Sequence, residues 1–368
     1  MIKALLVLNC GSSSLKFQAV RYDDLEVLIS GAVSGIGTGA VLSASLPGAA
    51  EPVRTPLVSH DHDAALAAVL DLIDAHDDDW ALAAVVHRVV HGGIDFREPV
   101  IVTPEIVARL RTLSPLAPLH QPHNLAGLAA SERLAPTAPD IACFDTAFHA
   151  GHDDLTTAFA LPREVREKGV RRYGFHGLSY EWISRRLREV RPDLAAGRVV
   201  AAHLGNGASL CALMDGVSVE TTMGMTALDG LPMGTRSGAL DPGAVTYLIR
   251  ELGYDAAGVE RLLYEQSGLK GLSGLTNDVR ALEASDAPEA RFALDYFARK
   301  VAQQAAVMAV SMGGIDAMVF TAGIGEHARA IRAAVVAQLA FLGPFEVLVE
   351  PANEERMMAI HAKALLGG

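Results

Sequence analysis

The sequence predicts an α/β protein built from two similar domains around a shared central cleft. The chain has 368 residues, 50% of them hydrophobic, which is more than one simple core accommodates. Strand-like apolar runs alternate with segments of helical periodicity in both halves. A strand, a Gly/Ser loop and a second strand near Gly11 are repeated near Gly207, about half a chain later. Duplication explains this spacing, and clefts between domains are where ligands usually bind.

The elements of the first half follow from the spacing of apolar residues. Leu15, Phe17 and Ala19 alternate with other side chains, as in a half-buried strand. A helix is predicted over residues 63–76, with Asp63 as its N-cap. Strands are predicted over residues 2–8, 15–21, 81–90 and 141–144, the last two as uninterrupted apolar runs typical of buried strands.

The second half repeats this alternation. Helices are predicted over residues 180–190, 243–252, 289–312 and 327–341, because apolar residues recur there at helical spacing. Strands are predicted over residues 198–204, 208–214 and 316–321.

The composition excludes several classes of protein. Lys and Arg total 31 against 43 Asp and Glu, and no basic run offers a polyanion a binding surface, so nucleic acid is not expected as a partner. The three cysteines are widely spaced, which predicts a reducing compartment and no disulfide framework. The N-terminal apolar run is too short for a signal peptide or a membrane span, so a cytoplasmic location without a membrane partner is expected.

A short Gly/Ser turn joins the first two predicted strands. Its backbone N–H groups and hydroxyls can bind a phosphate, and Lys16 can add a positive charge. A strand rather than a helix follows, and the Walker lysine motif is absent, so the segment is not a P-loop. For this motif alone an ordinary hairpin turn is the favoured interpretation. The second copy at residues 205–209 strengthens the phosphate interpretation.

Two arginines lie in segments that are otherwise apolar or rich in glycine. Arg88 lies inside the apolar run at 81–90, where an unpaired cation would be costly, so it must meet an anion. A structural ion pair and an anionic substrate explain Arg88 equally well. Arg236 lies in a glycine-bounded loop, and the two guanidinium groups together could bind a carboxylate and a migrating phosphoryl group.

Asp145 and His176 are further candidates for chemistry. Asp145 follows a buried strand, a position that in α/β sheets commonly faces the ligand, and His176 precedes a predicted helix. Taken singly, each residue is more often structural than catalytic. Four other histidines are interpreted as turn and cap residues without a metal role: His60, His62, His149 and His152.

Near the C-terminus, a strand, a glycine turn and the start of a helix follow one another at residues 317–327. The unpaired N–H groups of such a turn can bind an anion or a nucleotide. The third glycine of the dinucleotide fingerprint is missing, so no Rossmann site is predicted.

Taken in order, these segments resemble the acetate kinase family, which belongs to the actin-like, sugar-kinase and heat-shock ATPase superfamily. The combination spans nearly the whole chain and is highly specific, although several members are weak alone. The matching motifs lie at residues 9–16, 87–93, 115–120, 145–149, 171–177, 203–207, 233–238, 277–280 and 320–326.

The resemblance implies a duplicated actin-like, ribonuclease H-like fold, with ATP in the central cleft, and a homodimer. Domain I would cover residues 1–147 and take back the C-terminal helix, 352–368. Domain II would cover residues 148–351 and contribute the nucleotide site and the dimer contact. The implied activity is reversible, direct in-line transfer of the γ-phosphate of ATP to acetate, giving acetyl phosphate and ADP.

The resemblance also implies catalytic roles. Arg88 would bind the acyl carboxylate and Asp145 would orient or activate it. His176 and Arg236 would stabilise the transition state. This agrees with the physical chemistry, since a carboxylate is already a nucleophile and catalysis then consists mainly of alignment and charge neutralisation.

The same comparison implies metal and nucleotide ligands. Asn9 and Glu354 would help bind Mg²⁺, with Mn²⁺ as an alternative. The nucleotide would contact Ser12, Ser14, Lys16, His203, Leu204, Gly205, Asn206, Gly207, Asp278, Val279, Arg280, Gly323, Ile324, Gly325, Glu326 and His327.

The implied acyl pocket departs from the family pattern at one wall. Ala227 stands where the family has proline, which removes bulk, so propionate is predicted to be used within about tenfold of acetate. The pocket residues are Arg88, Val90, Leu119, Phe175 and Ala227. Further departures, none of which removes a proposed phosphate or carboxylate ligand, are Gln121, His123, Leu178, Tyr180, Met225, Asp229, Ala239 and His327.

Two alternatives stay open. The first is a propionate kinase or another short-chain acyl kinase of the same family. The second is a non-catalytic, actin-like nucleotide-binding switch, which would keep the loops but would not need Arg88, Arg236 and His176 together.

Overall fold

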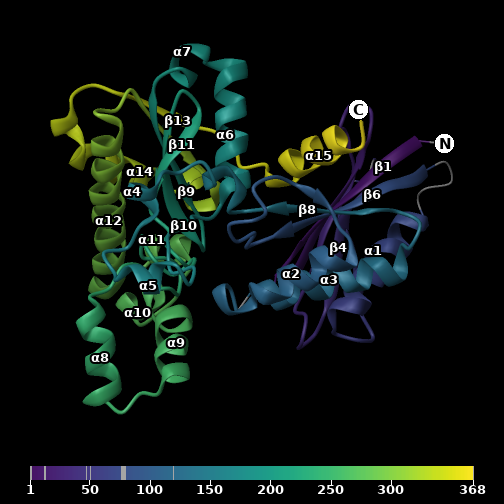
Figure 1. Ribbon diagram of the computed structural model, residues 1–368, viewed down its shortest axis with the longest axis horizontal. Helices are drawn as coiled ribbons and strands as arrows, with labels where there is room; N and C mark the ends of the chain where they lie inside the picture. Colours follow the sequence, from purple (N-terminus) through teal and green to yellow (C-terminus); the bar gives the residue numbers. More distant parts are fainter. Residues whose placement is uncertain are drawn as a thin grey trace. The chain divides into compact units, whose positions relative to one another are not determined.

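The computed structural model describes residues 2–11, 14–46, 48–49, 51–75, 80–118 and 120–367. The chain divides into two compact units. Unit 1 consists of Met1–Ala147 and Asn353–Gly368, and unit 2 is the single stretch Phe148–Ala352. Each unit contains one β-sheet with helices packed on it (Figure 1).

Unit 1 is built on an eight-stranded sheet in the order β5-β4-β3-β2-β1-β6-β8-β7. The central strand β1 buries Ala4, Leu5, Leu6, Val7 and Leu8 completely, which is why it appears as an uninterrupted apolar run. The strands are β1 (Ile2–Cys10), β2 (Ser14–Arg21), β3 (Val27–Ser34), β4 (Val41–Ser45), β5 (Val53–Pro56), β6 (Trp80–Val89), β7 (Val100–Ile101) and β8 (Asp140–Phe144).

The helices of unit 1 cover this sheet. The core on one side joins Leu66 and Val69 of α1 to Leu6 and Phe17 of the sheet. The C-terminal helix α15, drawn in yellow in Figure 1, packs against β1 and β6. The helices are α1 (His62–Asp74), α2 (Pro104–Thr112), η1 (Ser114–Leu116), α3 (Gln121–Leu134) and α15 (Glu354–Leu365), and η2 (Ala147–His149) spans the boundary between the units.

The N-cap of α1 corrects the sequence prediction. Asp61, not Asp63, has extended backbone angles, and its carboxylate accepts a hydrogen bond from the backbone N–H of Ala64. Asp63 lies in the first turn of the helix and forms an ion pair with Arg133. Both aspartates suit a helix start, and only the backbone conformation distinguishes them.

The sheet of unit 2 repeats the central strands of unit 1. Its order is β11-β10-β9-β12-β13, with β9 antiparallel to β10 and parallel to β12. In unit 1, β1 is likewise antiparallel to β2 and parallel to β6. The duplication predicted from the two Gly/Ser loops is therefore present in the topology. The strands are β9 (Arg198–Leu204), β10 (Ala208–Met214), β11 (Val217–Thr221), β12 (Ala317–Thr321) and β13 (Glu346–Val349).

The longest helix of unit 2, α12, runs along β9, β10 and β11 (Figure 1). It begins at Pro288 and ends where Gly313 adopts a left-handed conformation. The other helices are α4 (Asp154–Thr157), α5 (Arg163–Arg166), α6 (Gly177–Val190), α7 (Pro192–Ala195), α8 (Pro242–Arg250), α9 (Ala256–Glu265), α10 (Gly268–Ser273), α11 (Val279–Glu283), α13 (Ala322–His327), α14 (Arg329–Gln338) and η3 (Ala340–Leu342).

Two predictions for the last part of unit 2 are wrong. The helix predicted over residues 327–341 is divided into α13, α14 and η3. The predicted glycine turn is absent, because α13 begins directly after β12, with Ala322 in a left-handed conformation. Across the residues that the structure describes, no helix is long and apolar enough to cross a membrane.

Candidate active site

The first hairpin brings two predicted ligands side by side. Asn9 on β1 lies opposite Lys16 on β2 in the antiparallel register, and the backbone N–H of Gly11 donates to the carbonyl of Ser14 at 2.8 Å. His62, at the start of α1, donates through Nε2 to the carbonyl of Gly11 at 2.8 Å. Lys16 is exposed, and Ser12 lies outside the described residues. A phosphate role for this loop stays a prediction.

Arg88 meets two carboxylates inside unit 1. Its Nε and Nη2 atoms donate to Asp145 at 2.9 and 2.6 Å, and its Nη1 lies 3.1 Å from a carboxylate oxygen of Glu354. Burial alone would lower the pKa of the guanidinium, but Asp145 and Glu354 raise it above its ordinary value. The ion-pair interpretation of Arg88 is therefore confirmed. These contacts use three of the five N–H groups of an arginine, and substrate binding by the remainder stays a prediction.

The donor set at Asn9 and Glu354 fits an oxygen-binding cation. Glu354 is the first residue of α15, which packs on the strand that carries Asn9. Burial and the negative charge of Glu354 raise the pKa of the adjacent Glu355, a crowding of carboxylates that a cation would relieve. In the described ranges, no group of three or more His, Cys, Asp or Glu side chains could hold a metal. Mg²⁺ binding by Asn9 and Glu354 stays a prediction.

The second hairpin brings three predicted residues of unit 2 together. Gly207 lies in the loop between β9 and β10, and a Cβ atom placed on it would be 3.4 Å from Nε2 of His176. The same atom would be 3.8 Å from Nη1 of Arg236. An imidazole and a guanidinium from separate segments thus meet at one glycine. A guanidinium and an imidazole N–H at a glycine loop are suited to bind an anion.

His176 is held from three sides. It is the N-cap of α6 and adopts left-handed backbone angles, with φ of 58°. Its Nδ1 lies 2.8 Å from the hydroxyl of Ser209, and its ring stacks on that of His203 at a centroid distance of 4.1 Å. The Nδ1 of His203 lies 2.8 Å from the hydroxyl of Ser179. These contacts fix the position of the His176 ring.

Arg236 is anchored by residues that sequence reasoning missed. Its Nη1 donates to the carbonyl of Ala227 at 3.0 Å, and its guanidinium lies 5.9 Å from the ring centroid of Tyr264. Gly268 packs against the backbone of this loop, since an added Cβ would overlap the carbonyl oxygen of Met233. No periodicity or motif indicated Tyr264, because its contact joins α9 to a loop distant in sequence.

Asn206 joins its own predicted nucleotide loop to the Arg236 loop and to the residue before the predicted nucleotide segment 278–280. Its carbonyl accepts from the backbone N–H of Gly234 at 3.0 Å, and its side-chain oxygen accepts from Nδ2 of Asn277 at 2.9 Å. The adjacent Asp278 caps α11 by accepting from the backbone N–H of Arg280. Nucleotide contacts by these residues stay a prediction.

The remaining nucleotide candidates belong to β9, α11 and α13. Leu204 and Val279 are buried in the core, so only their backbone atoms are available to a ligand. An oxygen of the Glu326 carboxylate accepts from the backbone N–H of Ala352, which gives this side chain a structural role. Gly323 is exposed, with open space where a Cβ would be, whereas Gly325 is buried against β9. Ile324 and the exposed His327 complete the helix.

The predicted acyl pocket is described only in part. Val90 and Phe175 are buried, Ala227 is half-buried, and Leu119 lies outside the described residues. The backbone N–H of Val90 donates to Asn124, whose own amide donates to the carbonyl of Cys10. Asn124 therefore ties the ends of β1 and β6 together. The pocket itself stays a prediction.

Two histidines interpreted as turn and cap residues have a different role. Nε2 of His149 lies 3.0 Å from the carbonyl of Phe175, and its Nδ1 lies 2.8 Å from the hydroxyl of Ser218. Nε2 of His152 also lies 2.8 Å from that hydroxyl. A carbonyl only accepts, so the proton of the neutral His149 is on Nε2. Its Nδ1 must then accept from the hydroxyl of Ser218, and this hydroxyl in turn accepts from Nε2 of His152. The network holds the residue before His176.

Burial keeps both rings neutral. It lowers the pKa of His149 to about 3, with the neighbouring His152 as a further cause, and lowers that of His152 to about 4. The sequence did not indicate this network, because each histidine lies among small and acidic residues and the pattern does not reveal its distant partners.

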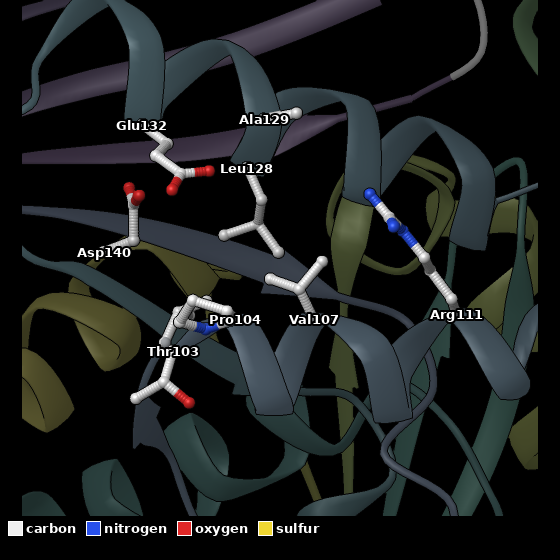
Figure 2. Close-up of a pocket in the computed structure, with 9 residues that line it drawn as sticks. Thr103, Pro104, Val107, Arg111, Leu128, Ala129, Glu132 and Asp140 are labelled. Atoms are coloured by element: carbon white, nitrogen blue, oxygen red, sulfur yellow. The ribbon is translucent and has the colours of Figure 1, made fainter.

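A separate cavity of about 240 Å³ lies in unit 1 between α2, α3 and the start of β8 (Figure 2). Val107 and Leu128 line it, together with the charged Arg111, Glu132 and Asp140. The carboxylate of Asp140 is already bonded to His87 and Ser131. Since no predicted site residue lines it, this cavity is not the candidate active site.

Two units whose sheets share one arrangement of central strands, each with a glycine hairpin at its central strand, define a duplicated actin-like α/β fold. The model of the Acetokinase family matches residues 4–359, so the chain belongs to this family. It is therefore a phosphotransferase with a carboxyl group as acceptor, from a family that uses ATP and ADP.

Named relatives and solved structures agree with this membership. The chain is 47% identical to the acetate kinase of Nitrobacter hamburgensis, over 99% of this chain and 90% of that protein. It is 44% identical to the acetate kinase of Methylocella silvestris, over 100% of this chain and 98% of that protein. The structure of Porphyromonas gingivalis acetate kinase is 35% identical with a TM-score of 0.89, covering 99% and 100% of the two chains. A propionate kinase from Francisella tularensis is 32% identical with a TM-score of 0.92, covering 98% of each.

Proposed function

We propose that this enzyme transfers the γ-phosphate of ATP to acetate, reversibly, giving acetyl phosphate and ADP. The observation that carries the proposal is the meeting of His176 and Arg236 at Gly207. A non-catalytic switch could keep a glycine loop for the nucleotide, but it would not need an imidazole and a guanidinium aimed at the same point. The names of the relatives support acetate as the acceptor.

In unit 1, the proposed task is to bind the acceptor and the phosphates. Arg88 binds the acetate carboxylate with the N–H groups that Asp145 and Glu354 leave, and Asp145 fixes the plane of the guanidinium. Lys16 and the Gly/Ser loop bind phosphate oxygens. Asn9 and Glu354 hold Mg²⁺, or Mn²⁺, which when bound neutralises phosphate charge.

In unit 2, the proposed task is to stabilise the transferred group. A carboxylate oxygen forms the new bond to the γ-phosphorus while the bond from this phosphorus to the bridging oxygen of ADP breaks, and no proton has to move. Negative charge spreads over the phosphoryl oxygens in the transition state, where the guanidinium of Arg236 and an N–H group of His176 stabilise it. The nucleotide lies along the segments that meet at Asn206 and Gly205.

Acyl hydroxamate formation tests this proposal directly. Purified protein is incubated with ATP, Mg²⁺, hydroxylamine and either acetate, propionate or butyrate, and the hydroxamate is measured. The proposal predicts rapid formation with acetate, and none in a matched reaction that lacks the acid. A switch without catalytic activity would give none with any acid.

Propionate is the second candidate substrate. Ala227 is half-buried, its carbonyl accepts from Arg236, and its small side chain stands at the position that the family fills with proline. The name of the Francisella relative also favours this candidate. A rate with propionate above that with acetate would reverse the order of the two proposals.

Two further expectations remain proposals. A homodimer is supported by several large apolar side chains that are exposed on and around α8, the kind of residue from which interaction surfaces are built. These residues are Leu240, Tyr247, Ile249, Leu252 and Tyr254. Light scattering during size-exclusion chromatography measures the mass.

A cytoplasmic location is supported by the three buried, unbridged cysteines, Cys10, Cys143 and Cys211.

A further inference from the structure

A hydroxyl chain leads from the core of unit 2 to His176. The hydroxyl of Tyr180 is hydrogen-bonded to that of Ser209, which in turn lies 2.8 Å from Nδ1 of His176. Tyr180 and Ser209 are fully buried. The backbone N–H of Tyr180 donates to the carbonyl of His176, one turn along α6. Tyr180 is also one of the positions at which this sequence departs from its family.

The direction of this chain decides which nitrogen of His176 carries the proton. A neutral imidazole has one N–H donor and one acceptor, and a serine has a single proton to donate. If Tyr180 donates to Ser209, then Ser209 donates to Nδ1 and the proton of His176 lies on Nε2. In the opposite direction, Nδ1 carries the proton and Nε2 presents a lone pair.

The position of Nε2 makes this choice matter. Nε2 is the atom of His176 nearest to Gly207, where Arg236 also arrives. An N–H group at this point stabilises negative charge that develops on phosphoryl oxygens, whereas a lone pair opposes it. The stacked ring of His203 holds the His176 ring in place, so that the tautomer is the remaining variable.

We propose that Tyr180 is a positioning residue for catalysis: its hydroxyl donates to Ser209, and Ser209 thereby holds His176 in the tautomer with the proton on Nε2. The inference rests on the proposed function, because it assigns His176 to the transferred phosphoryl group. It gives the tyrosine a task that its ring alone, packed edge-on against His149 at 5.7 Å, does not explain.

Tyr180→Phe removes the hydroxyl and keeps the ring. With one hydrogen bond of the chain lost, kcat should fall about tenfold, while KM for acetate and for ATP stays within about twofold. Tyr173→Phe is the matched control, because it also removes a hydrogen-bonded hydroxyl, here one that donates to the carbonyl of Gly169. Its kcat should stay within about twofold of wild type. A Tyr180→Phe variant with wild-type kcat overturns the inference.

The tautomer is measured without any turnover. In protein labelled with ¹⁵N-histidine, the imidazole signals of His176 should show a protonated Nε2 in wild type and a shifted or mixed state in Tyr180→Phe. A wild-type protein with the proton on Nδ1 overturns the inference. Wild type that forms no acetyl phosphate contradicts the proposed function instead, and the two failures are thus distinguished.

A double variant separates action through His176 from a general loss of packing. If Tyr180 acts through His176, then Tyr180→Phe should cost nothing further in a His176→Ala background, because coupled residues are not additive. A further tenfold loss in the double variant would mean that the hydroxyl acts elsewhere, which rejects the inference.

Discussion

Nε of Arg88 donates to one oxygen of Asp145 at 2.9 Å, and Nη2 donates to the other at 2.6 Å. This bidentate pair follows from the parallel register of β6 and β8, in which Arg88 lies opposite Cys143. Asp145 follows β8, and its backbone N–H donates to the carbonyl of Val89. Two strands thus deliver a cation and an anion to the same edge of the sheet.

Arg88→Ala should lower kcat/KM by about a hundredfold or more, because the acceptor carboxylate loses its cation. The variant should also be less stable than wild type, because it leaves two carboxylates without their partner. Breaking a fully buried ion pair costs about 3–5 kcal/mol, and the cost should be smaller here because the Arg88 side chain is partly exposed. Arg88→Lys keeps a charge but not the two parallel hydrogen bonds. Steady-state kinetics on the folded Lys variant therefore gives the cleaner measure. Turnover near wild type in that variant would mean that Arg88 is purely structural.

Arg236→Ala should also lower kcat/KM by about a hundredfold, because charge on the transferred phosphoryl group is then less compensated. Arg291→Ala is a matched control, since Arg291 is exposed on α12 and pairs with Asp295 four residues on. The control should retain wild-type kinetics. Equal rates for the two variants would remove Arg236 from the proposed mechanism.

His176→Ala should reduce kcat far more than it raises KM for acetate. The reason is that a group meeting developing charge acts mainly in the transition state. Initial rates across acetate and ATP concentrations separate the two parameters. An unchanged kcat with a raised KM would reassign His176 to ground-state binding of the substrate.

Ala227→Pro should restore selectivity for acetate. Wild type should use propionate within about tenfold of acetate in kcat/KM, since one methylene discriminates by only ~10–200-fold even in a fitted pocket. Proline keeps the carbonyl that accepts from Arg236, so the anchor of that guanidinium is preserved. The variant should shift the ratio toward acetate by several-fold. A wild-type preference for acetate above about a hundredfold would show that neighbouring residues fill the space.

His152 should make the stability of unit 2 depend on pH. Burial lowers its pKa from 6.5 to about 4 in the folded protein, with Asp153 opposing this shift and Arg171 adding to it. Below pH 6.5 the unfolded chain therefore takes up a proton that the folded protein does not, and stability is lost as the pH falls toward about 4. His152→Gln keeps an N–H donor and removes the titration. The stability of wild type relative to the variant should fall by at most about 1.4 kcal/mol per pH unit in this window.

Urea unfolding of both proteins between pH 7 and pH 5 makes this comparison. Carboxylates titrate in the same way in the two proteins, so the difference between them isolates the histidine. Parallel stability curves would show that His152 takes up protons in the folded state as readily as in the unfolded chain.

The sequence predicted the central strands well because their residues are mostly buried on both faces or, in β2, alternate between buried and more exposed positions. β1, β2, β9, β10 and β12 were expected within a few residues of their observed bounds. The edge strands were not expected. Every residue of β5 is exposed, so neither alternation nor an apolar run indicates it, and only pairing with β4 keeps it extended.

Some residues of the candidate site could likewise be predicted from the sequence, whereas their contacts could not. Arg88 and Asp145 could be singled out because a charged residue within or directly after an apolar run has no local explanation. Their mutual contact could not be predicted from either segment, because it depends on the register of two strands joined by a long connection. Ser209 was included in the second Gly/Ser loop, but its contact with His176 was not predicted. Tyr264 and Ser218 were not singled out, since each is an ordinary residue for its element and its role depends on a distant partner.

Because α15 packs on β1 and β6, unit 1 can be completed only after all of unit 2 has been synthesised. Unit 2 is one uninterrupted stretch, whereas unit 1 lacks Glu354 and the fully buried Met358 until the final helix has been synthesised. On the ribosome, the second unit can therefore close its core while the first still waits for its last helix. The carboxylate that pairs with Arg88 then arrives last, so a chain stopped short of α15 carries the guanidinium without one of its two anions.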